Sequence, residues 1–265
     1  MRSLLVLVAA CGATTPRSSP AVDWPDGCFI YRNAVGRVIE SDHARCSLPR
    51  RPYSTFKLAN ALIALDAGVL DNADSPMTWD PIAVPDDPDW PDVWRQPHTL
   101  RSAIEVSAVP HFRTLALGLG ETRMAAGLAK LHYGNQAMCC KLDLFWLEGA
   151  LRISAAEQLE FVDALAHGKL AVTAHAQEVV RDISVIARED RAVLHGKTGS
   201  GHVEGGSEAW LMWQVGWVER DGAVIPYASW LETKLSFEDA RALRTRRVRE
   251  TLAALGVMPS PAAPH

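Results

Sequence analysis

The sequence lacks any spacing of histidine, cysteine and acidic residues that is typical of a metal site. Its nine histidines form neither a His-x-His-x-Asp nor a His-Glu-x-x-His pattern, and zinc enzymes commonly hold their ion through such spacings. The formal net charge is only −4 over 265 residues, and so small an excess does not indicate binding to nucleic acid or to an anionic membrane surface. We therefore expect no metal cofactor and no nucleic-acid partner.

Internal repeats and a second domain are also missing from the pattern. Apolar residues make up 48% of the chain, which is enough for one sizeable core at this length. We expect one domain over residues 23–258, followed by a short tail over residues 259–265.

The first residues combine one arginine, a short apolar run and small residues ahead of Cys11, in the order MRSLLVLVAAC. This order is typical of an export signal with a lipoprotein-type end, and it is too short to span a bilayer. We expect residues 1–11 to be a signal sequence and residues 12–22 a flexible tether. Either Cys11 carries lipid or ordinary cleavage follows slightly later. The protein would then be periplasmic, and anchored to a membrane if it is lipidated.

Export changes the expectation for the other four cysteines, because an oxidising compartment permits disulfides. Cys28 and Cys46 flank what look like paired strands, so we expect a disulfide between them. Cys139 and Cys140 are adjacent, and a disulfide between neighbours needs an unusual, strained ring. We expect these two to be buried free thiols.

Strand patterns occur at both ends of the chain, and helical patterns fill the middle. The strand segments are residues 28–40, with a turn at 33–36, and residues 192–233, with an Asp-Gly hairpin turn at 221–222. The helical segments begin at Ser54, at Thr99 with an interruption at Pro110, at Ser154 with a capping box to Glu157, and near Ser236. This order predicts an α+β fold, with an antiparallel β-sheet flanked by helices and an inserted helical lobe over roughly residues 70–190.

A hydroxyl and an amine stand three positions apart in STFK, where Ser54 and Lys57 share one face of the first turn of an apolar helix. A lone Ser-x-x-Lys is expected about once by chance in a chain of this length. Two further short motifs follow in order. SAV, residues 107–109, lies at the predicted helix break, and KTG, residues 197–199, lies on a predicted strand.

These motifs are joined by YGN at 133–135, FWLEGALRISAAEQ at 145–158 and WQVGWVERDG at 213–222. The set resembles the class D β-lactamases, the oxacillinase type of the active-serine penicillin-recognising enzymes. The resemblance runs from about residue 27 to 256 and implies the serine β-lactamase and penicillin-binding transpeptidase fold. It also implies hydrolysis of the β-lactam ring of penicillin-type antibiotics through an acyl-serine intermediate.

The family uses an N-carboxylated lysine, and the resemblance implies this role for Lys57, with carbon dioxide or bicarbonate as its source and no metal or organic cofactor. Its carbamate would deprotonate Ser54 for acylation and a water for deacylation. Burial on an apolar helix lowers the pKa of a lysine, which leaves the neutral amine that this reaction needs. Trp146 would donate its indole N–H to the carbamate, and Val109 would keep water away from it.

The other motif residues receive their roles by the same resemblance. Ser107 would pass a proton to the departing lactam nitrogen, helped by the positive charge of Lys197. Thr198 would offer its hydroxyl to the substrate carboxylate. Gly199 would let the strand backbone lie close to the bound ligand.

The substrate's two oxygen-rich groups also need partners. The backbone N–H groups of Ser54 and Ser200 would form the oxyanion hole. One arginine of the last helix would bind the substrate carboxylate in bidentate fashion. Arg244 fits this role best, and Arg241 is the alternative.

Two other functions are weighed against hydrolysis. The first is a penicillin-binding sensor or weak D,D-peptidase of the same fold that is acylated but turns over slowly, and the second is a lipid-anchored binding protein with a decayed site. We favour hydrolysis because a sensor normally needs a membrane signalling part, for which the pattern offers no transmembrane segment, and because a decayed site is not expected where every catalytic position is filled. Pro110 and Arg113 depart from the family's pattern, and the loops at residues 86–98 and 200–209 are expected to set the antibiotic range. Both a monomer and a homodimer remain open.

Overall fold

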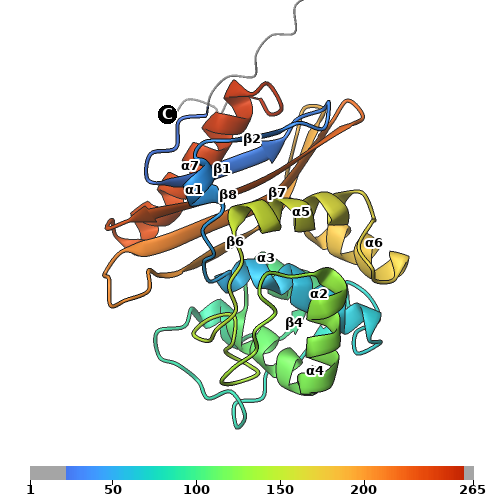
Figure 1. Ribbon diagram of the computed structural model, residues 1–265. Helices are drawn as coiled ribbons and strands as arrows, with labels where there is room; N and C mark the ends of the chain where they lie inside the picture. The colour runs from blue at the N-terminus through green and yellow to red at the C-terminus, as the bar shows by residue number, and fades with distance from the viewer. Residues whose placement is uncertain (1–21, 260–265) are drawn as a thin grey trace, which may run out of the picture.

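The computed structural model of the protein describes residues 22–259 (Figure 1). The predicted signal sequence, Cys11 and nearly all of the predicted tether lie outside the described residues. Within residues 22–259, no helix combines the length and hydropathy that crossing a membrane requires. In the same part of the chain, no three His, Cys, Asp or Glu side chains converge as a metal site would need.

Six antiparallel strands form the main sheet in the order β2-β1-β8-β7-β6-β5. Their bounds are Gly27–Arg32 (β1), Val38–Glu40 (β2), Val185–Glu189 (β5), Ala192–His202 (β6), Trp210–Arg220 (β7) and Ala223–Thr233 (β8). A separate two-stranded pair consists of β3, Pro76–Met77, and β4, His98–Thr99. The strands therefore come from both ends of the chain, as predicted.

The predicted hairpin turns are both present. β1 pairs with β2 across residues 33–37, and β7 pairs with β8 across Asp221 and Gly222. These two residues have φ values of 52° and 80°, and positive φ at both turn positions matches the right-handed twist of the flanking strands.

Helices fill the middle of the chain and its C-terminal end. Their bounds are His43–Cys46 (α1), Tyr53–Phe56 (η1, a 3₁₀ turn), Lys57–Asp66 (α2), Asp92–Arg95 (η2, a 3₁₀ turn), Leu100–Glu105 (α3), Val109–Leu131 (α4), Ala155–Ala166 (α5), Ala174–Ile183 (α6) and Phe237–Ala254 (α7). The predicted capping box of Ser154 and Glu157 opens α5. Thr99 likewise caps α3 through its side chain.

Pro110 does not interrupt a helix, contrary to the prediction. The chain leaves helical geometry after Glu105, and Pro110 lies in the first turn of α4. Proline is tolerated there because the first N–H groups of a helix have no partner inside the helix. The break predicted around residues 107–109 is therefore present, but it ends at the proline.

The sheet separates two apolar cores. α7 packs on β7 and β8 on one face, whereas α5 packs on β1, β7 and β8 on the other face. Beyond α5, α2 lies between α4 and α6, and Figure 1 shows this helical group on the opposite side of the sheet from α7. The turn η1 contacts β6. The residues just before α2 therefore lie where the helical group meets the sheet, as the α+β prediction requires.

A disulfide joins Cys28 of β1 to Cys46 of α1, which confirms that prediction. Cys139 and Cys140 are free, but they are exposed, so the prediction that they are buried was wrong. Their neighbours Met138 and Leu142 are half-buried and pack against the core. These two neighbours take the inward positions of the segment, which leaves the two thiols facing solvent.

Candidate active site

Ser54 and Lys57 lie in direct contact. Ser54 is in the turn η1, and Lys57 begins α2 one turn later. The Lys57 Nζ donates a hydrogen bond of 2.6 Å to the Ser54 Oγ. Ser54 is half-buried, whereas Lys57 has no exposed surface. The sequence spacing placed these two groups on one face, and the structure brings them together.

Burial sets the protonation of the Lys57 amine. Desolvation lowers the pKa of Lys57 well below its usual value, and the nearby positive charge of Lys197 lowers it further. The Phe112 ring lies on one side, with its centroid 5.5 Å from the Lys57 Nζ. Asn60 donates a hydrogen bond of 3.3 Å to the carbonyl of Phe112, which holds α4 against α2. The lowered pKa favours the neutral amine, which is the form that can act as a base or a nucleophile.

An indole N–H without a partner belongs to Trp146. The side chain of Trp146 is fully buried, and its ring centroid lies 5.1 Å from that of Phe56, the residue before Lys57. The Trp146 Nε1 has no hydrogen-bond partner among the described residues. An unsatisfied buried donor costs about 1–3 kcal/mol. Trp146 therefore carries a buried indole N–H that no group within residues 22–259 satisfies.

Ser107 occupies the break between α3 and α4. It is half-buried and has a φ of 59°, a left-handed conformation that non-glycine residues adopt at a cost. Val109 is the first residue of α4 and is also half-buried. The ring recorded over the Lys57 amine belongs to Phe112, one turn after Val109. The shielding role of Val109 stays a prediction, and the sequence pattern did not reveal Phe112.

The KTG motif lies on β6, directly against the turn that carries Ser54. A Cβ added to Gly199 would lie 2.7 Å from the carbonyl oxygen of Pro52 and 3.1 Å from the amide nitrogen of Thr55. A side chain at this position would push the strand away from η1. Glycine was predicted here for approach to a ligand. The structure shows that Gly199 also allows the strand to pack on the turn that carries the serine, and its role in approach to a ligand stays a prediction.

Lys197 and Arg244 are two further basic side chains of the candidate site. Lys197 is buried, and burial, followed by the charge of Arg244, lowers its pKa to about 7. Arg244 reaches across from α7 and donates a hydrogen bond of 3.1 Å from Nη1 to the Ser200 Oγ. Its Nε is buried and has no partner among the described residues. Thr198 follows Lys197 on β6 and is half-buried.

The two candidate arginines of α7 differ in environment. Arg244 is buried, and its burial together with the charge of Arg241 lowers its pKa to about 10. The Arg241 side chain is 55% exposed and pairs with Glu238 on the same helix. Only Arg244 of this pair is recorded in contact with β6, which favours Arg244 as the arginine of the site.

The comparisons with known proteins agree with this geometry. The family model described as the penicillin binding protein transpeptidase domain matches residues 33–252. The chain is 40% identical to Beta-lactamase OXA-10 of Pseudomonas aeruginosa over 206 residues, which cover 77% of this chain and 75% of that protein. It is 34% identical to Beta-lactamase OXA-48 of Klebsiella pneumoniae over 213 residues, or 78% and 75% of the two chains.

Solved structures give the same result. The crystal structure of FUS-1 (OXA-85), a class D β-lactamase from Fusobacterium nucleatum subsp. polymorphum, matches with a TM-score of 0.80 and 33% identity, and covers 88% of this chain and 93% of that one. The chain belongs to the class D β-lactamases. It is a serine β-lactamase, and the expected fold is confirmed.

In the class D enzyme, the buried Gln158 supports η1, the turn that carries Ser54. The Gln158 Nε2 donates hydrogen bonds of 2.9 Å to the Thr55 Oγ1 and 3.1 Å to the Tyr133 Oη. Tyr133 is fully buried and packs edge-on against Phe56. Tyr133 of the YGN motif therefore supports η1 from within the core.

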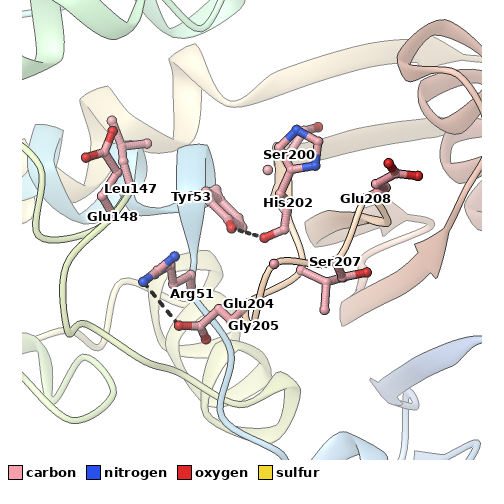
Figure 2. Close-up of a pocket in the computed structure, with 13 residues that line it drawn as sticks. Arg51, Tyr53, Leu147, Glu148, Ser200, His202, Glu204, Gly205, Ser207 and Glu208 are labelled. Carbon is pink, nitrogen blue, oxygen red and sulfur yellow. Dashed lines mark hydrogen bonds and ion pairs between the residues drawn. The ribbon is translucent and has the colours of Figure 1, made fainter.

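A cavity of about 700 Å³ adjoins the site in the class D enzyme (Figure 2). Of the predicted site residues, Ser200 lines it, at one edge. Figure 2 shows its two closing contacts: the Tyr53 hydroxyl donates to the carbonyl of His202, and Arg51 pairs with Glu204 at 3.1 Å. Glu204 also pairs with Arg152. The sequence analysis missed this ion cluster, because its members are far apart along the chain.

Proposed function

We propose that this protein hydrolyses the β-lactam ring of penicillin-type antibiotics through an acyl-serine intermediate, with N-carboxylated Lys57 as the general base. The observation that carries the proposal is the hydrogen bond of 2.6 Å between the Lys57 Nζ and the Ser54 Oγ. A fully buried amine in contact with a hydroxyl is the arrangement that a nucleophile and its base require.

The surroundings of Lys57 fit carboxylation. A neutral amine can attack the carbon of carbon dioxide, which forms a C–N bond and releases one proton to solvent. Burial supplies the neutral amine by lowering the Lys57 pKa. The product is an anion, and the unpaired Trp146 N–H is a buried donor beside the neighbouring Phe56. A hydrogen bond to a charged group contributes about 1.5–3 kcal/mol, so Trp146 would stabilise the carboxylated form.

Acylation would begin when the base takes the proton of Ser54 and the Oγ attacks the β-lactam carbonyl. The lactam C–N bond then breaks, and Ser107 relays the proton that the base took from Ser54 to the departing nitrogen, which returns the base to its unprotonated form. Lys197 would assist, because a pKa of about 7 allows it to hold a proton near neutral pH. For deacylation, the same base takes a proton from a water, the water attacks the acyl ester, and Ser54 leaves with its hydroxyl restored.

Substrate binding would use the groups gathered on β6. The carboxylate common to penicillin-type substrates would bind Arg244 and the Thr198 hydroxyl. Arg244 already reaches β6 through Ser200 and keeps a buried, unpaired Nε, and a guanidinium matches a carboxylate in bidentate geometry. The backbone N–H groups of Ser54 and Ser200 would form the oxyanion hole. Removal of one such donor typically costs about 2.7–4 kcal/mol of barrier.

The test is turnover of the chromogenic β-lactam nitrocefin by the purified protein. Ser54→Ala should abolish acylation, whereas Ser47→Ala, at an exposed position after α1, should leave turnover intact. Lys57→Ala should lose turnover, whereas the exposed Lys141→Ala should retain it. Turnover lost after acidification and restored by added bicarbonate distinguishes a carboxylated Lys57 from a neutral amine.

Two outcomes would count against the proposal. Ready hydrolysis by Ser54→Ala would refute the assignment of the nucleophile. Wild-type protein that is acylated but never releases product would instead indicate a penicillin-binding sensor or a weak D,D-peptidase.

A further inference from the structure

Two neighbouring thiols on the surface take no part in the proposed reaction. Cys139 and Cys140 are both free and exposed. Their Sγ atoms lie 2.8 Å apart and share a hydrogen bond. Any reagent that reaches one thiol therefore also reaches the other.

Cys139 and Cys140 lie at the start of the segment over residues 139–150, which carries Trp146. The carbonyl of Cys139 accepts a hydrogen bond of 3.4 Å from the amide of Ala150, so the chain leaves and returns at this point. Within the segment, the amide of Leu151 donates to the carbonyl of Phe145 at 3.2 Å. A change at the two cysteines therefore acts on the backbone that holds Trp146.

A second anchor fixes the same segment from the other side. Asp143, three residues after Cys140, is buried and pairs with Arg113 of α4 at 2.9 Å from Nε and 2.5 Å from Nη2. The anchor ties the segment to the helix whose Phe112 covers the Lys57 amine. The thiols thus lie on the same chain segment as Trp146, whose ring packs on Phe56, the residue before Lys57.

We propose that Cys139 and Cys140 form a redox modification site, at which exchange with oxidised glutathione closes a reversible disulfide between the two residues. One thiolate attacks a sulfur of the oxidant, which forms a mixed disulfide and releases one reduced glutathione. The second thiolate attacks the protein sulfur of that mixed disulfide and releases the second. The protein loses two electrons and two protons, which reduce one oxidised glutathione to two thiols.

Contact between the two thiols favours attack by the second sulfur over a lasting mixed disulfide, and the strain of a ring between neighbouring cysteines makes the resulting bond easily reduced. The second thiol already touches the first, so its attack is intramolecular and its effective concentration far exceeds that of free glutathione. Contact with Cys140 raises the pKa of the Cys139 thiol, so exchange should be faster at higher pH, where more thiolate forms. Exposed disulfides are also the labile ones, which makes the site reversible.

Closure of the disulfide should also change how readily Lys57 is carboxylated, and this part rests on the proposed function. A disulfide between the two cysteines restricts the backbone beside the hydrogen bond between Cys139 and Ala150. It therefore helps to hold Trp146 in its described position. The reduced protein should then need about fivefold more bicarbonate for half-maximal turnover, the effect of freeing roughly one backbone residue.

The chemical part is tested by intact mass after incubation of the full chain in glutathione buffers of graded redox ratio, followed by acid quenching and thiol alkylation. Oxidising buffers should remove two hydrogens and protect both thiols from alkylation, and reducing buffers should reverse this. Cys140→Ser cannot close the ring, so it should instead carry one bound glutathione at Cys139. Wild-type protein that is alkylated at both positions in every buffer, or that retains glutathione, overturns the site.

The coupling is tested by bicarbonate titration of nitrocefin turnover in the oxidised and reduced forms. The Cys139→Ser/Cys140→Ser double variant should behave like the reduced form in both buffers. Equal bicarbonate requirements in the two forms would overturn the coupling. Turnover that never depends on bicarbonate would instead overturn the carboxylated Lys57, while the mass measurement would still decide the thiol site.

Discussion

The indole nitrogen of Trp94 donates a hydrogen bond of 2.9 Å to the carbonyl oxygen of Val106, the residue before Ser107. Arg95, beside it, donates to the carboxylates of Asp86 and Asp92. The loop over residues 86–98, which was expected to influence antibiotic range, is thus held together by its own ion pairs. It is also hydrogen-bonded to the residue before Ser107, the proposed proton donor.

Trp94→Phe should slow acylation. The change removes the hydrogen bond to Val106 and keeps an aromatic ring, so the loss should be up to about tenfold, the effect of about 0.5–1.5 kcal/mol for one net hydrogen bond. Trp90→Phe is the matched control, because Trp90 lies against Trp94, with ring centroids 6.1 Å apart, whereas the hydrogen bond to Val106 comes from Trp94. Stopped-flow acylation by nitrocefin is the measurement. An equal effect of both variants would mean that the loop acts only through its packing.

Trp146→Phe should raise the bicarbonate requirement for turnover by about 10- to 100-fold, because it removes a charge-assisted hydrogen bond worth about 1.5–3 kcal/mol. Excess bicarbonate should restore part of the rate. Trp217→Phe is the control, because Trp217 is equally buried but donates to Glu219. A bicarbonate requirement that Trp146→Phe leaves unchanged contradicts the role of this N–H.

Arg244→Ala should weaken substrate binding by about 10- to 100-fold, because it removes a charged partner of the substrate carboxylate. Arg241→Ala should have little effect, because the Arg241 side chain is more than half exposed and pairs with Glu238. Dissociation constants measured with the non-turnover Ser54→Ala protein separate binding from chemistry. Similar losses in both arginine variants would argue against a specific contact.

The stability of the protein should rise with pH above neutrality because of Lys197. Its folded pKa is about 7, lowered by burial and Arg244 from a usual value of 10.5. Between these values the unfolded chain binds more protons, so the unfolding free energy increases with pH, by at most about 1.4 kcal/mol per unit. Below about pH 7 both states are protonated and the contribution becomes constant. Urea denaturation in carbon-dioxide-free buffers should show a shallower slope for Lys197→Met than for wild type. Lys141→Met, at an exposed position, should keep the wild-type slope.

Glu204→Gln should loosen the loop over residues 203–208 beside the site. Glu204 pairs with both Arg51 and Arg152, but its side chain is 36% exposed, so the loss of stability should be about 1 kcal/mol or less. The apparent KM should change most for penicillins with large side chains. Glu208→Gln is the control, because Glu208 lines the same cavity without a recorded ion pair. Equal changes in both variants would show that the ion cluster does not shape the cavity.

Features that depend on neighbours in sequence were predicted well. The Ser154 capping box, the Asp221-Gly222 turn and the shared face of Ser54 and Lys57 each involve residues at most three positions apart. Local backbone geometry decides such features, so spacing was sufficient. Pro110 was placed correctly but interpreted wrongly, because proline is compatible with both the end of one helix and the first turn of the next.

The sequence by itself determined the α+β order of elements, the pairing of Ser54 with Lys57 and, through six ordered motifs, the family. Tertiary structure alone decided that Arg244 rather than Arg241 reaches β6, that Phe112 covers Lys57 and that Glu204 joins Arg51 to Arg152. These relationships join residues that lie tens of positions or more apart, and only the packing of helices on the sheet fixes such distances. Packing also decided the exposure of Cys139 and Cys140, because their neighbours Met138 and Leu142 are the residues that pack against the core.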